Sequence, residues 1–179
     1  MDKYGGIDMG IGQFSEALQQ VMVRRGETLA TAGRAAHVDG SQIGKILKGT
    51  RKASETVMKA AVRHYDDIQL IIGAGEEVMG GACVPYLDGA DLHPSSTHIK
   101  TIEEVQEALQ ALLQLPITKR LDQLGPGDLE NIKDGIMEQL EAITALTHNA
   151  AVLCRKYDLS YISMWNDHRA ELKLKKYMK

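Results

Sequence analysis

The sequence predicts an all-α protein in two parts. Five short helices are expected over residues 1–79, and a helical hairpin or coiled-coil-like body over residues 101–179. Aromatic residues make up only 4% of the chain while Ala, Leu, Gln and Glu are plentiful, which favours helices over sheets. Apolar residues recur at helical spacing in both parts. The stretch 73–96 is rich in Gly and contains two prolines, which indicates a linker, placed at residues 80–100.

The N-terminal part begins with a loose arm over residues 1–11, expected from Gly5, Gly6 and Gly10. The next segment places apolar residues on one helical stripe and ends at Gly26. Ser54 is expected to cap a fourth helix, and a fifth apolar segment follows from Ile68. The apolar residues of these helices are Phe14, Leu18, Val21, Met22, Val57, Met58, Ala61, Val62, Ile68, Leu70, Ile71 and Ile72.

Residues 26–49 predict two short helices joined by a tight turn. Thr28 is a good N-cap for the first helix, and small residues after it allow a second helix to approach closely. Asp39-Gly40-Ser41 breaks the first helix and caps the second, which carries Ile43 and Ile46 as apolar anchors. Lys48-Gly49 ends it, with a cation at the C-terminus and a glycine that can take positive φ. This arrangement is the helix-turn-helix, whose second helix enters the DNA major groove.

The segment from Gln13 to His64 resembles the phage repressor/Cro-like helix-turn-helix family, also called the xenobiotic-response-element family. The similarity is strongest in Val38-x4-Ile43-x2-Ile46-x2-Gly49 and the basic link after it. The chain departs from the family at Leu29, where a phosphate-binding Gln is usual, at Ala32-Gly33, where Leu-Ala is usual, and at His37, where Gly is usual. The resemblance implies base readers at Gly40, Ser41, Gln42 and Lys45, and phosphate contacts from Thr28, Arg51, Lys52, Arg24 and Arg25.

Charge is distributed unevenly along the chain. Residues 12–64 hold nine Lys or Arg against four Asp or Glu, whereas residues 65–160 hold six bases against sixteen acids. A positive head on an acidic body is the electrostatic pattern expected when one end meets phosphate.

The C-terminal part predicts two helices and a tail. Thr101 and Glu104 form a capping-box pattern that opens a helix with Ile102, Val105, Leu109, Leu112 and Leu113, ending near Pro116. A long helix over about 128–157 repeats apolar residues every seven positions, which predicts a dimer interface, an intramolecular hairpin with the preceding helix, or both together. The interface residues are Leu129, Ile132, Ile136, Ile143, Leu146 and Leu153. In the tail, Trp165 is expected to seal a core or an interface.

No catalytic pattern is present, so an enzyme is not expected, and no cofactor is predicted. Asp88, Asp91, His93 and His98 are interpreted as solvated loop residues rather than metal ligands. The lone cysteines, Cys83 and Cys154, and the lack of a signal or membrane-spanning run favour a cytoplasmic protein without membrane contact. The family resemblance implies that it is prokaryotic, or phage-encoded in a bacterial host.

The expected function is a repressor-like transcription regulator that binds double-stranded operator DNA as a homodimer through residues 40–48. Two alternatives remain open. One is an antitoxin-like or effector-sensing regulator whose acidic helical body binds a protein or peptide. The other is a helical scaffold that does not bind DNA.

Overall fold

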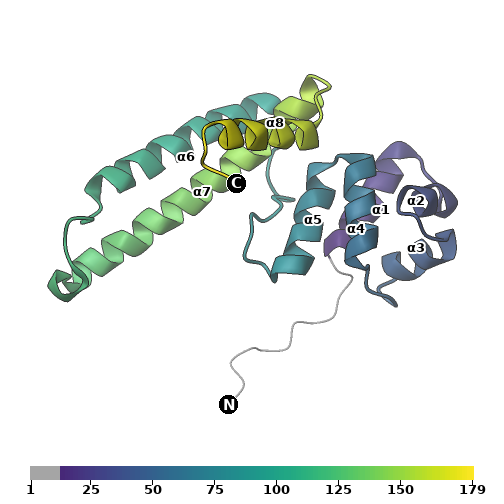
Figure 1. Ribbon diagram of the computed structural model, residues 1–179, viewed down its shortest axis with the longest axis horizontal. Coiled ribbons are helices and arrows are strands. Elements are labelled where there is room, and N and C mark those ends of the chain that lie inside the picture. Colours follow the sequence, from purple (N-terminus) through teal and green to yellow (C-terminus); the bar gives the residue numbers. More distant parts are fainter. Residues whose placement is uncertain (1–12) are drawn as a thin grey trace, which may run out of the picture. The chain divides into compact units, whose positions relative to one another are not determined.

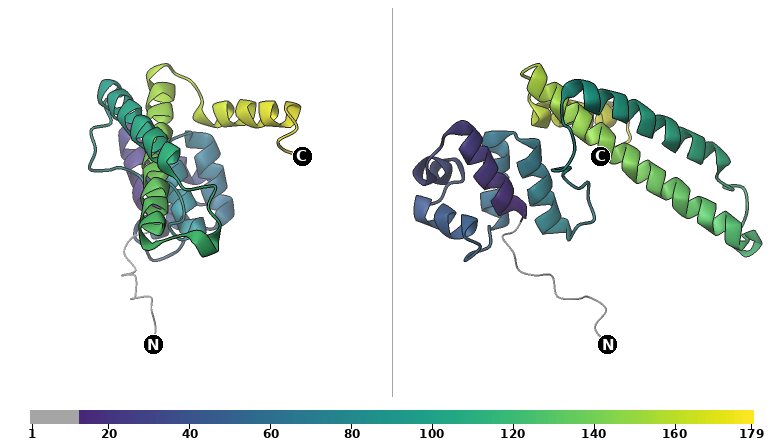
Figure 2. Two further views of the ribbon diagram at one scale, coloured as in Figure 1. Left: turned by 90° about the vertical axis from the view of Figure 1, so that its left-hand side faces the viewer. Right: turned by 180° about the vertical axis from the view of Figure 1, so that it is seen from behind.

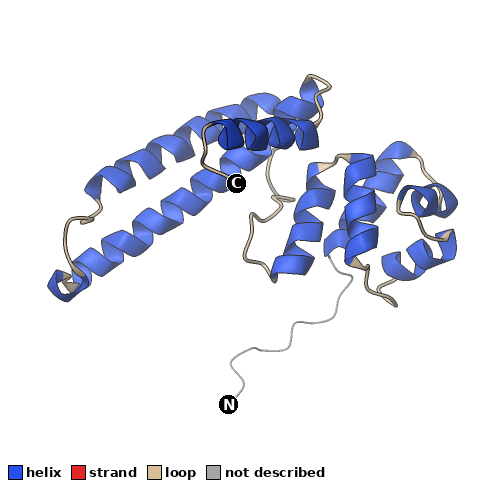
Figure 3. Ribbon diagram, viewed as in Figure 1, coloured by secondary structure: helices blue, strands red, loops and turns tan. Residues whose placement is uncertain are grey.

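The computed structural model describes residues 13–179, and all regular structure in that range is helical (Figure 3). The predicted all-α fold is confirmed for this part of the chain. The loose arm expected over residues 1–11 lies outside the described residues. The chain divides into two compact units, Met1–Tyr86 and Leu87–Lys179. No helix within residues 13–179 is both long enough and apolar enough to cross a membrane.

Unit 1 contains the five predicted helices, and the fifth ends at Met79 as expected (Figure 1). They are α1 (Gln13–Arg25), α2 (Leu29–Ala35), α3 (Gly40–Leu47), α4 (Glu55–Tyr65) and α5 (Ile68–Met79). Each helix contributes to one core, which includes Phe14, Leu18, Val21, Ala32, Ile43, Ile46, Val57, Ala61, Tyr65 and Leu70. The first part of the Gly-rich stretch 73–96 thus belongs to helix α5, which ends at Met79.

Unit 2 is a long helical hairpin followed by a shorter helix (Figure 2). Its elements are α6 (Pro94–Gln114), the 3₁₀ turn η1 (Leu121–Gln123), α7 (Pro126–Lys156) and α8 (Tyr161–Leu174). Helices α6 and α7 run antiparallel side by side, and α8 contacts α7. The predicted ends near Pro116 and Tyr157 agree with the structure to within two residues.

The predicted start of α6 is wrong by about two turns. The helix begins at Pro94, whose fixed φ suits the first helical position, and the His93 side chain accepts the Ser95 N–H as its cap. The irregular linker therefore spans residues 80–93 rather than 80–100. Thr101 lies inside the helix, so the predicted capping box with Glu104 does not form; Glu104 instead binds Lys100 at 2.6 Å.

The buried residues of α6 and α7 are mostly small or polar. On α6 they are Thr97, Thr101, Glu104 and Ala108, and on α7 they include Gly135, Ala142, Ala151 and Val152. A Cβ on Gly135 would lie 2.8 Å from Leu115 Cδ2, so this glycine makes room for the leucine that follows α6. The tight packing explains why a helix-weakening glycine stands in mid-helix.

The residues predicted as a dimer interface do not form the inner face of this hairpin. Leu129, Ile136, Ile143 and Leu146 are 45–49% exposed, and Ile132 and Leu153 are partly buried. They lie on a flank of α7, because the small residues occupy the side that faces α6. The alternative in which this apolar repeat packs only within the hairpin is therefore wrong.

The Thr101 hydroxyl tests the contact between the two helices. It lies 2.7 Å from the Thr97 carbonyl oxygen and 3.1 Å from the Ala145 carbonyl oxygen on α7. Thr101→Val should lower the free energy of unfolding by about 0.5–1.5 kcal/mol, because a buried donor is removed at nearly constant volume. Thr144→Val is the control, since that hydroxyl bonds only the Leu140 carbonyl of its own helix. Equal losses in urea denaturation of the two variants would contradict this role for Thr101.

Candidate nucleic-acid interface

Local capping interactions fix the helix-turn-helix of unit 1. The Thr28 hydroxyl accepts the Thr31 N–H at 3.2 Å, and the Asp39 carboxylate accepts the Ser41 N–H at 2.7 Å. Hydrogen bonding by the Ser41 side chain, and then by its backbone N–H, holds the pKa of Asp39 below its usual range. His37 has φ of 57° and Gly49 has φ of 69°, as the turn and the helix end require.

Two glycines allow α2 and α3 to meet at backbone distance. A Cβ on Gly33 would lie 2.6 Å from the Val38 carbonyl oxygen, and a Cβ on Gly40 would lie 3.0 Å from the Ala30 nitrogen. Position 40 therefore faces α2. Gly40, one of the predicted base readers, has no side chain and packs closely against the backbone of α2.

The other predicted base readers lie on the open side of α3. Ser41 and Lys45 are exposed and Gln42 is partly buried, while Ile43 and Ile46 on the opposite side are fully buried in the core. Helix α3 thus presents a short polar surface whose backbone is held by the core beneath it. Leu29, at the start of α2, is 43% exposed and cannot donate a hydrogen bond to phosphate.

The chain after α3 folds back onto the end of that helix. The Lys45 carbonyl oxygen accepts the Thr50 hydroxyl at 3.0 Å and the backbone N–H groups of Thr50 and Arg51. This turn places exposed Arg51 and Lys52 beside the C-terminus of α3. Lys48 is also exposed there. It was not predicted as a phosphate contact, because Lys48-Gly49 indicated only the end of the helix.

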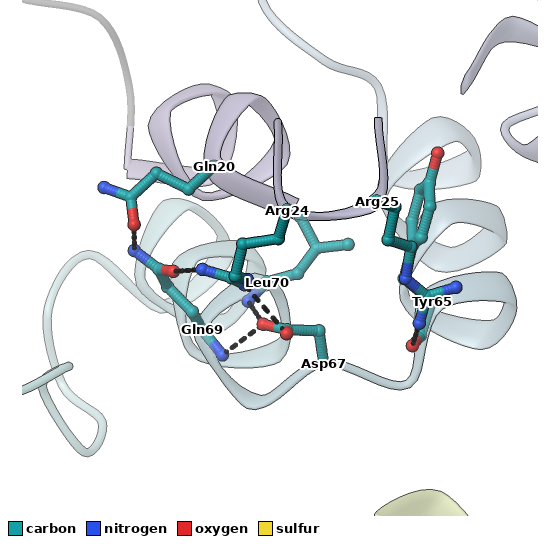
Figure 4. A network of polar contacts seen from close by, with 7 residues as sticks. All are labelled: Gln20, Arg24, Arg25, Tyr65, Asp67, Gln69 and Leu70. Carbon is teal, nitrogen blue, oxygen red and sulfur yellow. Dashed lines mark hydrogen bonds and ion pairs between the residues drawn. The ribbon is translucent and has the colours of Figure 1, made fainter. Parts of the chain in front are cut away.

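Arg24 was predicted to bind phosphate, but its guanidinium group has partners within unit 1 (Figure 4). It donates to Asp67 Oδ2 at 2.9 Å and to Gln69 Oε1 at 3.1 Å, and Gln69 in turn donates to Gln20 at 2.8 Å. The Asp67 carboxylate also caps α5 by accepting the Gln69 and Leu70 N–H groups. This network links α1 to the start of α5.

Arg25, like Arg24, makes its contacts within unit 1. Its guanidinium group donates to the Tyr65 carbonyl oxygen at 2.7 Å and its Cζ lies 5.1 Å from the centre of the Tyr65 ring. The Tyr65 hydroxyl donates to Glu27 Oε2 at 2.6 Å; burial, then this bond, raises the pKa of Tyr65. Both arginines therefore use their donors to hold α1 against α4 and α5, which leaves fewer for DNA than the resemblance implied.

A separate basic hollow of about 660 Å³ lies between α2 and α4. Arg34, Lys59 and Arg63 line it, together with His37 and His64. The nine cations of residues 12–64 thus fall into three groups: two in the α1–α5 network, three at this hollow, and Lys45, Lys48, Arg51 and Lys52 on and after α3. Only the last group surrounds the predicted reading surface.

In unit 2 the structure brings together three glutamates that the sequence reading did not connect. Glu104, Glu138 and Glu141 place carboxylate oxygens within 4.8 Å of one another. Oxygen ligands of this type suit hard divalent cations, but Lys100, bound to Glu104, already supplies one counter-charge. Partial burial, then repulsion from Glu141, raises the pKa of Glu138. Glu104 lies on α6 and the other two glutamates on α7, so the cluster could not be predicted without knowing how the two helices align in the hairpin.

Asp91 and His93 of the linker stabilise the start of α6. Asp91 accepts the His93 N–H at 3.0 Å and the Ser96 hydroxyl, which holds the pKa of Asp91 below its usual range. His93 caps α6. The buried His148 lies 2.9 Å from the Thr144 carbonyl oxygen and accepts the Leu87 N–H at 3.2 Å, as expected for a satisfied buried histidine.

Gly33→Ala should disturb the helix-turn-helix, because the new methyl group would meet the fixed backbone of the turn. We expect a loss of about 1–3 kcal/mol in the free energy of unfolding. Gly44→Ala, on the same motif, is the control: its Cβ would lie 3.4 Å from the flexible tip of Leu29, and Ala favours helix. Thermal unfolding by circular dichroism would rank the two variants, and a stable Gly33→Ala would contradict the close approach.

Glu138→Gln should stabilise unit 2 at neutral pH. A carboxyl group with a raised pKa in the folded state favours folding when protonated, so this contribution is lost as pH rises through the folded pKa. We therefore expect the wild-type melting temperature to rise as pH falls from 7 toward 5, and the substitution to weaken that dependence. Glu130→Gln, on the same helix outside the cluster, is the control. A lower melting temperature for Glu138→Gln at pH 7 would contradict this.

Comparisons with models of known protein families, with curated proteins and with solved structures find no match for this chain. Its function is therefore inferred from the residues and their geometry.

Proposed function

We propose that this chain is a sequence-specific, DNA-binding transcription regulator of repressor type, encoded by a bacterium or a phage and acting in the bacterial cytoplasm. The observation that carries the proposal is the exposed surface of α3. Ser41, Gln42 and Lys45 stand on a helix with a capped N-terminus whose opposite side is fully buried, and exposed cations follow at its C-terminus. This is the layout that a recognition helix requires.

The two sets of residues divide the work of binding. Arg51 and Lys52, with Lys48, attract phosphate and give affinity that depends on salt but not on sequence. Lys45 can donate to the O6 and N7 acceptors of guanine, and Gln42 can pair with adenine. Ser41 can bond to either base. Thr28 caps α2, and we expect it to contact a phosphate, because the first helix of a helix-turn-helix crosses the DNA backbone.

A homodimer is part of the proposal. One head offers few base contacts, whereas two linked heads read two half-sites together, so that their binding free energies combine. An effector-sensing or antitoxin-like regulator is the second candidate, because the acidic cluster of unit 2 suits a basic peptide. A scaffold protein would differ from both by showing no salt-dependent DNA binding.

Lys45→Ala should reduce affinity for the cognate site by about 1–3 kcal/mol and change binding to random DNA much less, because only base contacts are lost. Arg51→Ala should weaken both kinds of DNA alike and lower the slope of log K against log salt by about 1. The cognate site would first be selected from genomic fragments, and affinities measured by fluorescence anisotropy.

Lys59→Ala provides the matched control, since this exposed lysine lies at the hollow between α2 and α4 rather than on α3. It should leave both affinities nearly unchanged. If Lys59→Ala weakens cognate binding while Lys45→Ala does not, α3 is not the reading helix.

A further inference from the structure

The α6–α7 hairpin has two unlike faces. Glu104, Glu138 and Glu141 converge on one side of the contact between the helices. Glu107 and Asp134 are close enough to repel Glu138, and Lys100 pairs with Glu103 and Glu104. Helical periodicity places the large apolar residues of both helices about a quarter turn away on the other side. One face of the hairpin is therefore acidic and the other apolar.

The apolar face is continuous over both helices. We define the apolar face as Ile102, Val105, Leu109 and Leu112 on α6 with Leu129, Ile136, Ile143 and Leu146 on α7. Of these eight residues, Val105 is the least exposed at 38% and Leu109 the most exposed at 52%. All eight members are Ile, Val or Leu.

Unit 2 buries few large apolar side chains by itself. Every member of the hydrophobic core cluster belongs to unit 1, while the buried apolar residues of unit 2 are Ala108, Ala142, Ala151, Val152, Cys154 and Tyr161. Two helices form only one layer, and a stable helical domain needs a second layer over its apolar side. Within unit 2, α8 borders only the Ile143–Leu146 end of this apolar side, and the large apolar residues along α6 and α7 remain about half exposed.

The size of the open surface fits a protein partner. The apolar face, with half-exposed Met164 and Trp165 beyond its end, leaves on the order of 800 Å² open per chain, about what one partner contributes to a stable interface. Isolated monomers rarely leave a connected apolar surface larger than a few hundred Å².

We infer that a second copy of this chain covers the apolar face, so that two hairpins pack face to face as a four-helix bundle. The Ile, Val and Leu residues repeat along both helices at the three-, four- and seven-residue spacing that helix-on-helix packing uses. A symmetric pair needs a surface that complements itself, and an uncharged aliphatic face satisfies that condition. The acidic faces cannot meet in this way, because like charges would be brought together.

The same contact continues into a groove between α7 and α8. This groove, of about 570 Å³, is lined by Ile143 and Leu146 of the apolar face and by Met164, Trp165 and His168 of α8. In the bundle, the end of the partner's hairpin would fill it, which gives α8 and the single tryptophan a place at the interface. The interface thus includes α6 and α8 as well as the α7 residues predicted from the sequence.

Sedimentation of the full chain without DNA tests this inference, which rests on unit 2 and not on the proposed DNA binding. The wild-type chain should sediment as a dimer at micromolar concentration. Leu109→Asp on α6 and Ile143→Asp on α7 should each give helical monomers, with a dimer dissociation constant raised at least ~10-fold. Gln110→Asp is the matched control, because it puts the same charge on the next residue of α6, away from the apolar face, and should remain dimeric.

Leu109→Gln extends the test if the aspartate variants lose helicity in circular dichroism, since it removes apolar surface without adding charge. Its dissociation constant should also rise relative to that of Gln110→Asp. A monomeric wild-type chain, or Leu109→Asp and Leu109→Gln variants as dimeric as Gln110→Asp, would overturn the inference. Lys45→Ala should stay dimeric, so a failure of the DNA-binding proposal would appear in affinity and not in sedimentation.

Discussion

Each amphipathic helix must bury one face, and the two units of this chain meet that requirement differently. In unit 1 all five helices direct large side chains such as Phe14, Ile43 and Leu70 to one enclosed core. In unit 2 the side on which α6 and α7 meet is occupied by Thr97, Thr101, Ala108, Gly135 and Ala142, so the larger residues remain on the flank. Close packing of small residues brings the helices together, but it buries too little apolar surface to stabilise a separate layer.

The proposed DNA-reading surface depends on the enclosed core of unit 1. The exposed face of α3 is short, and its side chains can meet a groove in a fixed register only if the helix itself does not move. Buried Ile43 and Ile46 hold its inner side, Gly33 and Gly40 bring it against α2, and Asp39 fixes its first turn. The Arg24 and Arg25 networks secure α1 beneath this arrangement. Such preorganisation limits the entropy lost on binding.

Much of the fold could be predicted from the sequence, because its signals are local. Thr28, Asp39 and Ser54 cap the helices they were expected to cap, and His37 takes the left-handed conformation that the turn needs. The predictions failed where residues outside the local segment determine the structure. Thr101 and Glu104 match a capping box, yet Pro94 starts the helix earlier and Ala145 and Lys100 bind the two side chains. Sequence spacing located the apolar repeat of α7 but not the direction it faces.

The candidate site was harder to predict than the fold for a related reason. The sequence does not show whether the N–H donors of a Lys or Arg side chain already bond to other groups of the protein. Arg24 and Arg51 look alike in the sequence and both are exposed, but the Arg24 guanidinium group donates to Asp67 and Gln69, which leaves it fewer donors for DNA. The charge that we propose binds phosphate is therefore concentrated in Lys48, Arg51 and Lys52, at and after the end of α3. With a net charge of −3 for the whole chain, non-specific attraction to DNA is limited, and two linked heads would be needed to combine modest affinity with sequence selectivity.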